Sequence, residues 1–196
     1  MIDLTLEQML SRTHFRHSGF AMMLQLMQSR TAPLIVETGC SRGLNFGFEG
    51  DGFSTIIFDK FVHTHGGELY AVDLNPQHVA FASSNVGPSS HIICSDSVKF
   101  LWHLKDTLQQ QGKFIDLLYL DSFDFEKDNP HPSSMHHIKE LLAIICCLKP
   151  GSILAVDDNF GTVEARSGKG KYVEEFMNNI GVPLIHDGYQ LIWQMT

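Results

Sequence analysis

The chain has 196 residues, of which 43% are hydrophobic, and its formal net charge is -8. This size and composition predict one globular domain whose core needs neither disulfides nor a structural metal. The negative charge disfavours nucleic acid as a partner, and the four cysteines contain no CxxC pair, which favours a reducing compartment. Because no segment is apolar and long enough for a signal-peptide core or a membrane span, we expect a cytoplasmic protein without membrane association.

The first segment, residues 3–30, carries apolar side chains at helical spacing and predicts one or two amphipathic helices. These helices precede the first predicted strand. We therefore divide the chain into an N-terminal helical extension, residues 1–33, and a main domain, residues 34–196. The apolar stripe favours packing against the core, although its methionines would also suit the wall of a substrate pocket.

A short apolar run, residues 34–36, ends in Glu37 and is followed by Gly39 and Gly43. The run is typical of a strand buried on both faces, and the glycines would let the following turn bring its backbone against a ligand. This pattern predicts a nucleotide pocket at the end of the strand, although a purely structural turn has the same pattern. The next helix is expected to begin near Ser54, a plausible cap, with its positive end toward the ligand.

A second apolar run ends at Asp73, roughly thirty residues after the first, which is the spacing of a βαβ unit. A carboxylate at the tip of this strand can accept hydrogen bonds from both hydroxyls of a ribose. The alternative is that Asp73, or Asn75 with Pro76, only starts the next helix.

The rest of the chain alternates between strand and helix patterns. Strands are predicted at 91–94, 115–120 and 152–156, and helices through 100–108, 135–148 and 172–177. Near the C-terminus, Asp187 and Gly188 separate two β-rich runs, which indicates a hairpin. We therefore predict an α/β protein: a Rossmann-like, doubly wound, mainly parallel seven-stranded sheet with a C-terminal antiparallel hairpin.

Taken in order, these motifs resemble those of the class I S-adenosylmethionine-dependent methyltransferases. A nicotinamide dehydrogenase would instead show G-x-G-x-x-G at the first turn. The resemblance implies that Glu37 and the glycine turn surround the methionine part of the cofactor, that Asp73 takes the ribose, and that Asp96 and Ser97 read the adenine. The residues expected to bind the cofactor are Glu37, Thr38, Gly39, Cys40, Ser41, Gly43, Ser54, Asp73, Leu74, Asp96, Ser97 and Asp121.

Within that class, the acids after the fourth and fifth strands are similar to those of small-molecule O-methyltransferases that use a divalent cation, the catechol, macrolide-sugar and cephalosporin-related group. The resemblance implies that Asp121, Asp158 and Asn159 hold Mg²⁺, a cation that prefers such oxygen ligands. The metal would lower the pKa of the acceptor hydroxyl. The alternative is that these acids cap helices or face solvent.

The general base is left open. The catechol enzymes place a lysine three residues after the first metal-binding aspartate, where this chain has Asp124. The sugar-modifying relatives use a histidine, which can take a proton near neutral pH, and this chain offers His131, His136 and His137. The catalytic candidates are therefore Asp121, His136 and His131.

The resulting hypothesis is methyl transfer from S-adenosylmethionine to a hydroxyl of a small molecule, assisted by Mg²⁺. The alternatives are an N- or C-methyltransferase without metal, a non-catalytic nucleotide-binding or regulatory protein, and a dehydrogenase on a related sheet. The hairpin edge and the N-terminal helices are candidate surfaces for a homodimer. We expect the basic cluster of Arg166, Lys169 and Lys171 to lie in a solvated loop.

Overall fold

A seven-stranded sheet in the order β3-β2-β1-β4-β5-β9-β8 forms the centre of the computed structural model, which describes residues 2, 4–162 and 165–196. The strands are β1 (Leu34–Thr38), β2 (Glu68–Asp73), β3 (Ser90–Cys94), β4 (Ile115–Leu120), β5 (Leu148–Val156), β8 (Leu184–Asp187) and β9 (Leu191–Gln194). Strands β1 to β5 pair in parallel, and β9 lies antiparallel between β5 and β8. The predicted doubly wound sheet with its terminal hairpin is confirmed.

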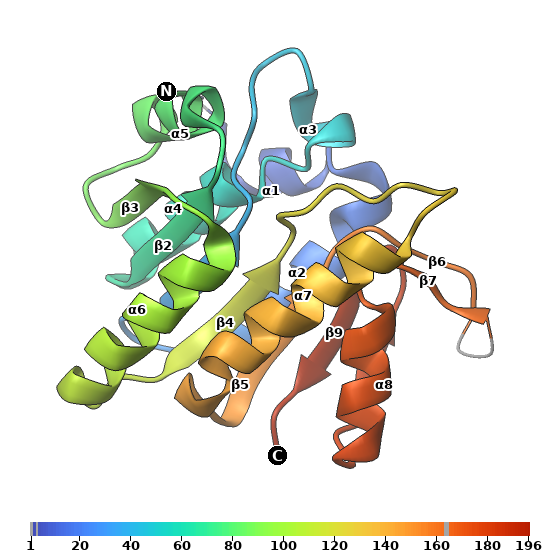
Figure 1. Ribbon diagram of the computed structural model, residues 1–196. Helices are drawn as coiled ribbons and strands as arrows, with labels where there is room; N and C mark the ends of the chain where they lie inside the picture. The colour runs from blue at the N-terminus through green and yellow to red at the C-terminus, as the bar shows by residue number, and fades with distance from the viewer. Residues whose placement is uncertain (1, 3, 163–164) are drawn as a thin grey trace.

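Helices cover both faces of this sheet (Figure 1). One face carries α1 (Leu6–Leu10), α2 (His17–Met27) and α4 (Ser54–His65), and the other carries α6 (Ser97–Gln111), α7 (His131–Ile144) and α8 (Lys171–Asn179). Because successive side chains of a strand point to opposite faces, Val36 of β1 packs in the cluster under α6, α7 and α8, whereas Ile35 packs in the cluster under α1, α2 and α4. Among the described residues, the helices are all too short or too polar to cross a bilayer.

The N-terminal helices belong to the same core as the sheet. The Phe20 ring of α2 lies 5.8 Å from both the Phe58 ring of α4 and the Tyr119 ring of β4. Gly19 allows α2 to approach β9, because a Cβ at this position would lie 2.0 Å from the Gln190 Oε1 atom. The segment that begins the chain is thereby fixed against the sheet, next to the carboxyl ends of its central strands.

Two element boundaries differ from the prediction. Helix α7 begins at His131, several residues early, because Pro132 is favoured in a first helical turn. Strand β5 begins at Leu148, so Lys149, Pro150 and Gly151 belong to the strand and not to a turn. The parallel pairing shifts register between Ile115 and Leu117, and this irregularity accommodates a proline that cannot donate to the ladder.

The start of α4 also differs. Ser54 is its first helical residue, and the cap position is held by Phe53 in the left-handed region at φ 49° without a side-chain hydrogen bond. The prediction that Ser54 caps the helix is therefore wrong. The remaining short elements are η1 (His14–Arg16), α3 (Gly47–Gly50), α5 (Pro76–Asn85) and η2 (Ile145–Cys147).

A small hairpin follows β5 and was not predicted. Strands β6 (Asn159–Phe160) and β7 (Ser167–Gly168) pair antiparallel in a separate two-stranded sheet. The hairpin returns the chain to the carboxyl end of β5 before α8 begins. It therefore places the residues that follow β7 at the edge of the sheet where the strand-end acids lie.

Candidate functional site

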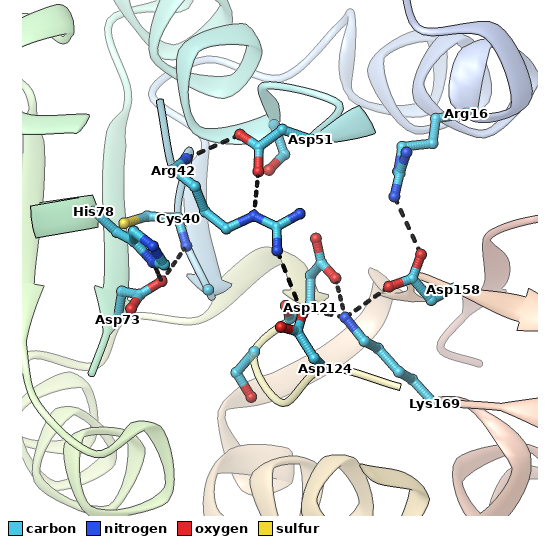
Figure 2. Close-up of a pocket in the computed structure, with 13 residues that line it drawn as sticks. Arg16, Cys40, Arg42, Asp51, Asp73, His78, Asp121, Asp124, Asp158 and Lys169 are labelled. Atoms are coloured by element: carbon cyan, nitrogen blue, oxygen red, sulfur yellow. Dashed lines mark hydrogen bonds and ion pairs between the residues drawn. The ribbon is translucent and has the colours of Figure 1, made fainter. Parts of the chain in front are cut away.

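Two adjoining cavities lie at the carboxyl ends of the central strands, and both are lined by Gly39, Asp73 and Ser122. The first cavity is strongly polar (Figure 2); its other lining residues are Arg16, Cys40, Arg42, Asp51, Ser54, His78, Asp121, Asp124, Asp158 and Lys169. The second cavity is more apolar; its other lining residues are Val72, Leu74, Asp96, Ser97, Phe123 and His136. An elongated ligand with one polar and one aromatic end would fit this pair of cavities.

The glycine turn after β1 forms the floor where the two cavities meet. Gly39 has a φ of 81°, and a Cβ at this position would lie 2.6 Å from the Asp121 carbonyl oxygen. Only glycine allows the turn to lie this close to the end of β4. The turn is held further by the Cys40 amide, which donates to Asp73 Oδ2 at 3.2 Å.

Asp73 ends β2 beside this turn and keeps 14% of its side chain exposed. Its Oδ1 atom accepts a hydrogen bond from the Asn75 amide at 2.7 Å. Asn75 and Pro76 start α5, as the alternative expected, and Asn75 is the cap, which accepts from the Gln77 amide at 2.9 Å; Asp73 itself is not the cap. Asp73 is instead a carboxylate fixed at the junction of the two cavities.

Several of the expected cofactor residues lie under the turn and support it. Glu37 is fully buried; burial raises its pKa to about 8, and the nearby Ser54 and Thr55 hydroxyls oppose this shift. Thr38 Oγ1 donates to Glu140 Oε2 at 3.0 Å, and the Ser41 amide donates to Thr55 Oγ1 at 2.9 Å. Glu37, Thr38, Ser41 and Gly43 line neither cavity. Their contacts shape the turn rather than the cavity surface.

The second cavity combines an apolar floor with a few polar groups. Asp96 caps α6 by accepting from the Lys99 amide at 2.8 Å. The Ser97 hydroxyl lies 2.9 Å from His136 Nε2, and the Phe123 ring stacks at a tilt on His136 with 5.4 Å between ring centroids. A flat heteroaromatic ring would find apolar and aromatic surface here, with hydrogen-bonding groups at its edge.

His136 belongs to a buried polar network behind this cavity. The Glu140 carboxylate has no exposed surface, accepts from Ser122 Oγ at 2.6 Å, and lies 3.3 Å from His136 Nε2. Burial raises the pKa of Glu140, but the His136 and Ser122 contacts more than offset it, so the net shift is downward. The network fixes Ser122, and with it the chain at the end of β4.

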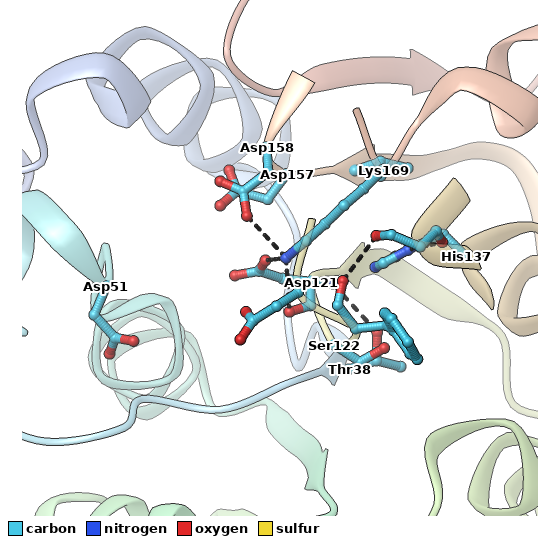
Figure 3. A network of polar contacts seen from close by, with 12 residues as sticks. Thr38, Asp51, Asp121, Ser122, His137, Asp157, Asp158 and Lys169 are labelled. Atoms are coloured by element: carbon cyan, nitrogen blue, oxygen red, sulfur yellow. Dashed lines mark hydrogen bonds and ion pairs between the residues drawn. The ribbon is translucent and has the colours of Figure 1, made fainter. Parts of the chain in front are cut away.

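Three carboxylates gather at the far end of the first cavity (Figure 3). Each of Asp121, Asp157 and Asp158 contributes one carboxylate oxygen, and these three oxygens lie within 4.8 Å of one another. Asp157 was not among the expected ligands, whereas Asn159 was. The structure places the Asn159 amide elsewhere: Oδ1 accepts from the Gly170 amide, and Nδ2 donates to the carbonyl oxygens of Val156 and Asp157. Its amide oxygen is therefore not available to a cation in this arrangement.

Two basic side chains fill the space around these carboxylates. Lys169 Nζ lies 2.5 Å from Asp121 Oδ1 and 2.9 Å from Asp158 Oδ2, and Arg16 Nε donates to Asp157 Oδ2 at 2.7 Å. The expectation that Lys169 lies in a solvated loop is wrong, because only 1% of its side chain is exposed. Arg166 is likewise buried, in an ion pair with Glu174.

The charges in this cluster stabilise one another. Burial lowers the pKa of Lys169, but the carboxylates of Asp121 and Asp158 more than offset it, and the net shift is upward. Burial also raises the pKa of Asp158, but Lys169 and a hydrogen bond from Tyr189 bring it down to about 2. Burial dominates for Asp121, whose pKa is raised well above its ordinary value. Lys169 and Asp158 are therefore both charged at neutral pH.

The cluster as arranged does not fit Mg²⁺. Lys169, Arg16 and Tyr189 occupy four of its six carboxylate oxygens: Asp121 Oδ1, Asp157 Oδ2 and both oxygens of Asp158. Mg²⁺ requires ligand oxygens at roughly 2.0–2.1 Å in octahedral geometry, and the lysine ammonium lies between the two carboxylates that would supply them. The expected set of Asp121, Asp158 and Asn159 is therefore not a magnesium site in this structure.

The two histidine candidates for a general base lie away from the carboxylate cluster. His136 lines the second cavity. His131 lies at the start of α7, where its Nδ1 atom is 2.7 Å from the Tyr172 hydroxyl in an exposed contact. Neither histidine lines the first cavity, whereas Asp121 does.

Arg16 and Lys169 are site residues that sequence reasoning missed, as are Arg42, which lines the first cavity, and Asp157, which joins the carboxylate cluster. Lys169 stands between Gly168 and Gly170, and two glycines around a basic residue indicate a close approach of backbone. Arg16 gave no such signal, because a basic residue between two predicted helices is common on a surface.

The sequence matches no protein-family model and no curated protein. Solved structures nevertheless share the fold. CalS11, a calicheamicin methyltransferase, has a TM-score of 0.63 at 13% identity, over 96% of this chain and 79% of its own. Its apo structure, named TDP-rhamnose 3′-O-methyltransferase, gives 0.57 at 16% identity over 90% and 79%. SMU.1697c of Streptococcus mutans, described as a candidate methyltransferase in complex with S-adenosylhomocysteine, gives 0.59 at 11% identity over 100% of both chains. The chain therefore has the Rossmann-like fold of the S-adenosylmethionine-dependent methyltransferases.

Proposed function

We propose that this protein transfers a methyl group from S-adenosylmethionine to a hydroxyl of a small molecule. The observation that carries the proposal is the pair of cavities joined at Gly39 and Asp73, with a carboxylate cluster at the far end of one of them. The structural likeness to an O-methyltransferase of TDP-rhamnose supports a hydroxyl as the target.

The residues present suit S-adenosylmethionine. Gly39 lets the turn after β1 lie against the backbone at the end of β4, where any Cβ would collide with the Asp121 carbonyl oxygen, and both cavities open at this turn. Asp73 offers its carboxylate at the junction, where a ribose would lie. The second cavity, between Leu74 and Phe123, would take the adenine. In the first cavity Arg42, held by Asp51 at 2.7 Å, offers a positive charge for a ligand carboxylate. Bound there, S-adenosylmethionine supplies a methyl carbon that its sulfonium already activates, so that an acceptor oxygen can displace S-adenosylhomocysteine.

The protein's own contribution is to align the acceptor and to remove its proton. Asp121 lines the first cavity, and 19% of its side chain is exposed. Lys169 pairs with its Oδ1 atom. We assign Asp121 as the acceptor of the hydroxyl proton, which leaves the acceptor oxygen free to form its new bond to the methyl carbon. Fixed alignment and exclusion of water supply much of the rate in such a displacement.

Aromatic side chains beside the carboxylate cluster would hold the acceptor. Tyr189 donates to Asp158 Oδ1 at 2.5 Å, and its ring packs against Phe160 at 5.6 Å and Phe15 at 6.0 Å between centroids. Phe15 is 72% exposed and Phe160 is 41% exposed, so both rings remain partly open to solvent. Such rings suit the flat side of a sugar or an aromatic ring that carries the hydroxyl.

The first experiment is a calorimetric titration of S-adenosylhomocysteine into the protein. We expect binding at one site per chain, and at least a tenfold loss of affinity in Asp73→Asn, because hydrogen bonds to charged groups contribute about 1.5–3 kcal/mol. Asp106→Asn, on the exposed surface of α6, is the control. The absence of any S-adenosylhomocysteine binding would overturn the proposal.

Turnover is then measured with a methyl-labelled donor and a panel of phenols and nucleotide sugars, using mass spectrometry of the products. A labelled methyl ether establishes hydroxyl transfer. A label on nitrogen or carbon would instead favour an N- or C-methyltransferase, and tight cofactor binding without any turnover would favour the non-catalytic alternative.

A further inference from the structure

Lys169 is a cation that the chain itself carries into the carboxylate cluster. Its ammonium has three acceptors: Asp121 Oδ1 at 2.5 Å, Asp158 Oδ2 at 2.9 Å and the Asp121 carbonyl oxygen at 3.3 Å. An ammonium has three N–H donors, so its hydrogen-bonding capacity is fully used here. The side chain is 1% exposed, and Figure 3 shows its Nζ atom between the two aspartates.

The backbone around Lys169 is fixed on both sides. The Lys169 amide donates to the Asp158 carbonyl oxygen at 3.2 Å. On one side Ser134 Oγ donates to the Gly168 carbonyl oxygen at 2.7 Å, and on the other the Gly170 amide donates to Asn159 Oδ1 at 2.7 Å. The position of the ammonium therefore does not depend on a flexible surface side chain.

The two flanking glycines make this close approach feasible. A Cβ at Gly168 would lie 2.3 Å from the Asp158 carbonyl oxygen, and a Cβ at Gly170 would lie 2.6 Å from Asn159 Oδ1. Gly168 also has a φ of 123°, which side-chain-bearing residues rarely adopt. Any larger residue on either side would push the β6–β7 hairpin, and Lys169 with it, away from the carboxylates.

We propose that Lys169 takes the place at which the enzymes that this sequence resembles bind a divalent cation, so that the site works with a fixed ammonium and without metal. The role of this site in holding an acceptor rests on the proposed function. The absence of a metal site does not, because cation binding can be measured without a methyl donor. An ammonium whose donors are all occupied offers no open coordination position. The acceptor would therefore be held by shape and by Asp121, and a single hydroxyl would suffice where metal chelation would favour two neighbouring ones.

The test is a titration with Mn²⁺, followed by electron paramagnetic resonance of the free ion. We expect wild-type protein to bind no Mn²⁺ at millimolar concentration. Lys169→Ala removes the ammonium and leaves the carboxylates, so we expect it to bind one Mn²⁺ per chain. The double variant Lys169→Ala with Asp158→Ala should lose that binding. Lys171→Ala, at the start of α8 and outside both cavities, should behave like wild type.

Circular dichroism and S-adenosylhomocysteine titration accompany each variant. If Lys169→Ala is unfolded alone, Mn²⁺ should restore its folded spectrum, because the ion would replace the missing charge. The proposal would be overturned if wild type bound one Mn²⁺ and Asp158→Ala lost it. It would also be overturned if Lys169→Ala were folded but bound no Mn²⁺, or were unfolded and not rescued by Mn²⁺. Failure of S-adenosylhomocysteine to bind wild type would contradict the proposed function but leave the Mn²⁺ result interpretable.

Discussion

Arg16 Nε donates to Asp157 Oδ2 at 2.7 Å and joins the N-terminal helices to the end of β5, across 141 positions of sequence. Both side chains are almost completely buried, with 6% and 0% exposed. The Arg16 guanidinium also donates to Asp158 Oδ1 at 3.1 Å and stacks on the Tyr189 ring at 4.6 Å. The N-terminal segment thus supplies one of the two cations that hold the carboxylate cluster together.

Removal of this cation should destabilise the fold. In Arg16→Met, Asp157 would be left buried with neither oxygen paired, since its Oδ1 atom already has no hydrogen-bond partner. Loss of one partner from a buried ion pair typically costs about 3–5 kcal/mol. Urea denaturation should show this loss in the free energy of unfolding. Arg12→Met, at an exposed position of the same segment, should change it by less than about 0.5 kcal/mol. Equal stability of the two variants would contradict the structural role of Arg16.

The proton-accepting role proposed for Asp121 predicts that its substitution affects turnover and leaves cofactor binding nearly unchanged. Asp121→Asn keeps the size of the side chain but removes the basic oxygen, so we expect the rate of methyl transfer to fall by roughly 10²–10⁴-fold. The affinity for S-adenosylhomocysteine should change by only a few fold. Asp128→Asn, at an exposed position of the same loop that lines neither cavity, is the control and should retain wild-type turnover. Undiminished turnover in Asp121→Asn would show that another group takes the proton.

The burial of Glu37 predicts a specific pH dependence of stability. Its pKa is about 8 in the folded protein and 4.5 ordinarily, so the unfolded chain releases this proton first. The contribution of protonated Glu37 to the free energy of unfolding is complete below pH 4.5 and is lost as the pH rises through 8. Relative to wild type, Glu37→Gln should therefore become more stable with increasing pH across this window, by up to about 1.4 kcal/mol per pH unit.

Denaturation of both proteins at pH 5, 6, 7 and 8 gives this difference directly, and other titrating groups common to both cancel. Exposed Glu175→Gln is the control and should show no such trend. A constant difference between wild type and Glu37→Gln would mean that Glu37 is ionised in the folded protein throughout.

Two glycines with similar backbone angles allow a test of the turn after β1. Gly39 and Gly47 have φ values of 81° and 62°, but a Cβ would meet the Asp121 carbonyl oxygen at 2.6 Å in the first case and no atom within 4 Å in the second. Gly47→Ala should therefore cost only about 1 kcal/mol for its left-handed conformation. Gly39→Ala should cost about 1–3 kcal/mol more and abolish S-adenosylhomocysteine binding, because the turn must move away from β4. Equal effects would show that the close approach at Gly39 is not required.

The sheet could be predicted from the sequence because its signals are local. Strand β4 runs from Ile115 to Leu120 as expected, since a short run of large apolar residues bounded by polar ones has few other structures available. Strand β5 was predicted to begin at residue 152, because Pro150 and Gly151 form a strong turn signal in isolation. Pairing with β4 overrides that signal, and pairing is a tertiary interaction that the local pattern does not contain.

The site was less predictable for the same physical reason. Gly39 and Asp73 belong to motifs that follow individual strands, so their convergence at one edge follows from the parallel sheet. The partners of Asp121 and Asp158 come from η1 and from the residue after β7, and no local pattern links these segments to the strand ends. The sequence motifs therefore identified the aspartates of the cluster but not Arg16 and Lys169, the cations that pair with them.

Lys169 reaches the aspartates through a hairpin that is part of the polypeptide, so its occupancy of that position is independent of any concentration. A diffusible ion would instead occupy such a site in proportion to its free level and affinity, and would leave when that level falls. The tethered charge would thus make the protein insensitive to the supply of divalent cations. The positive charge beside the two aspartates is set when the chain is synthesised, and only a substitution in the sequence would remove it.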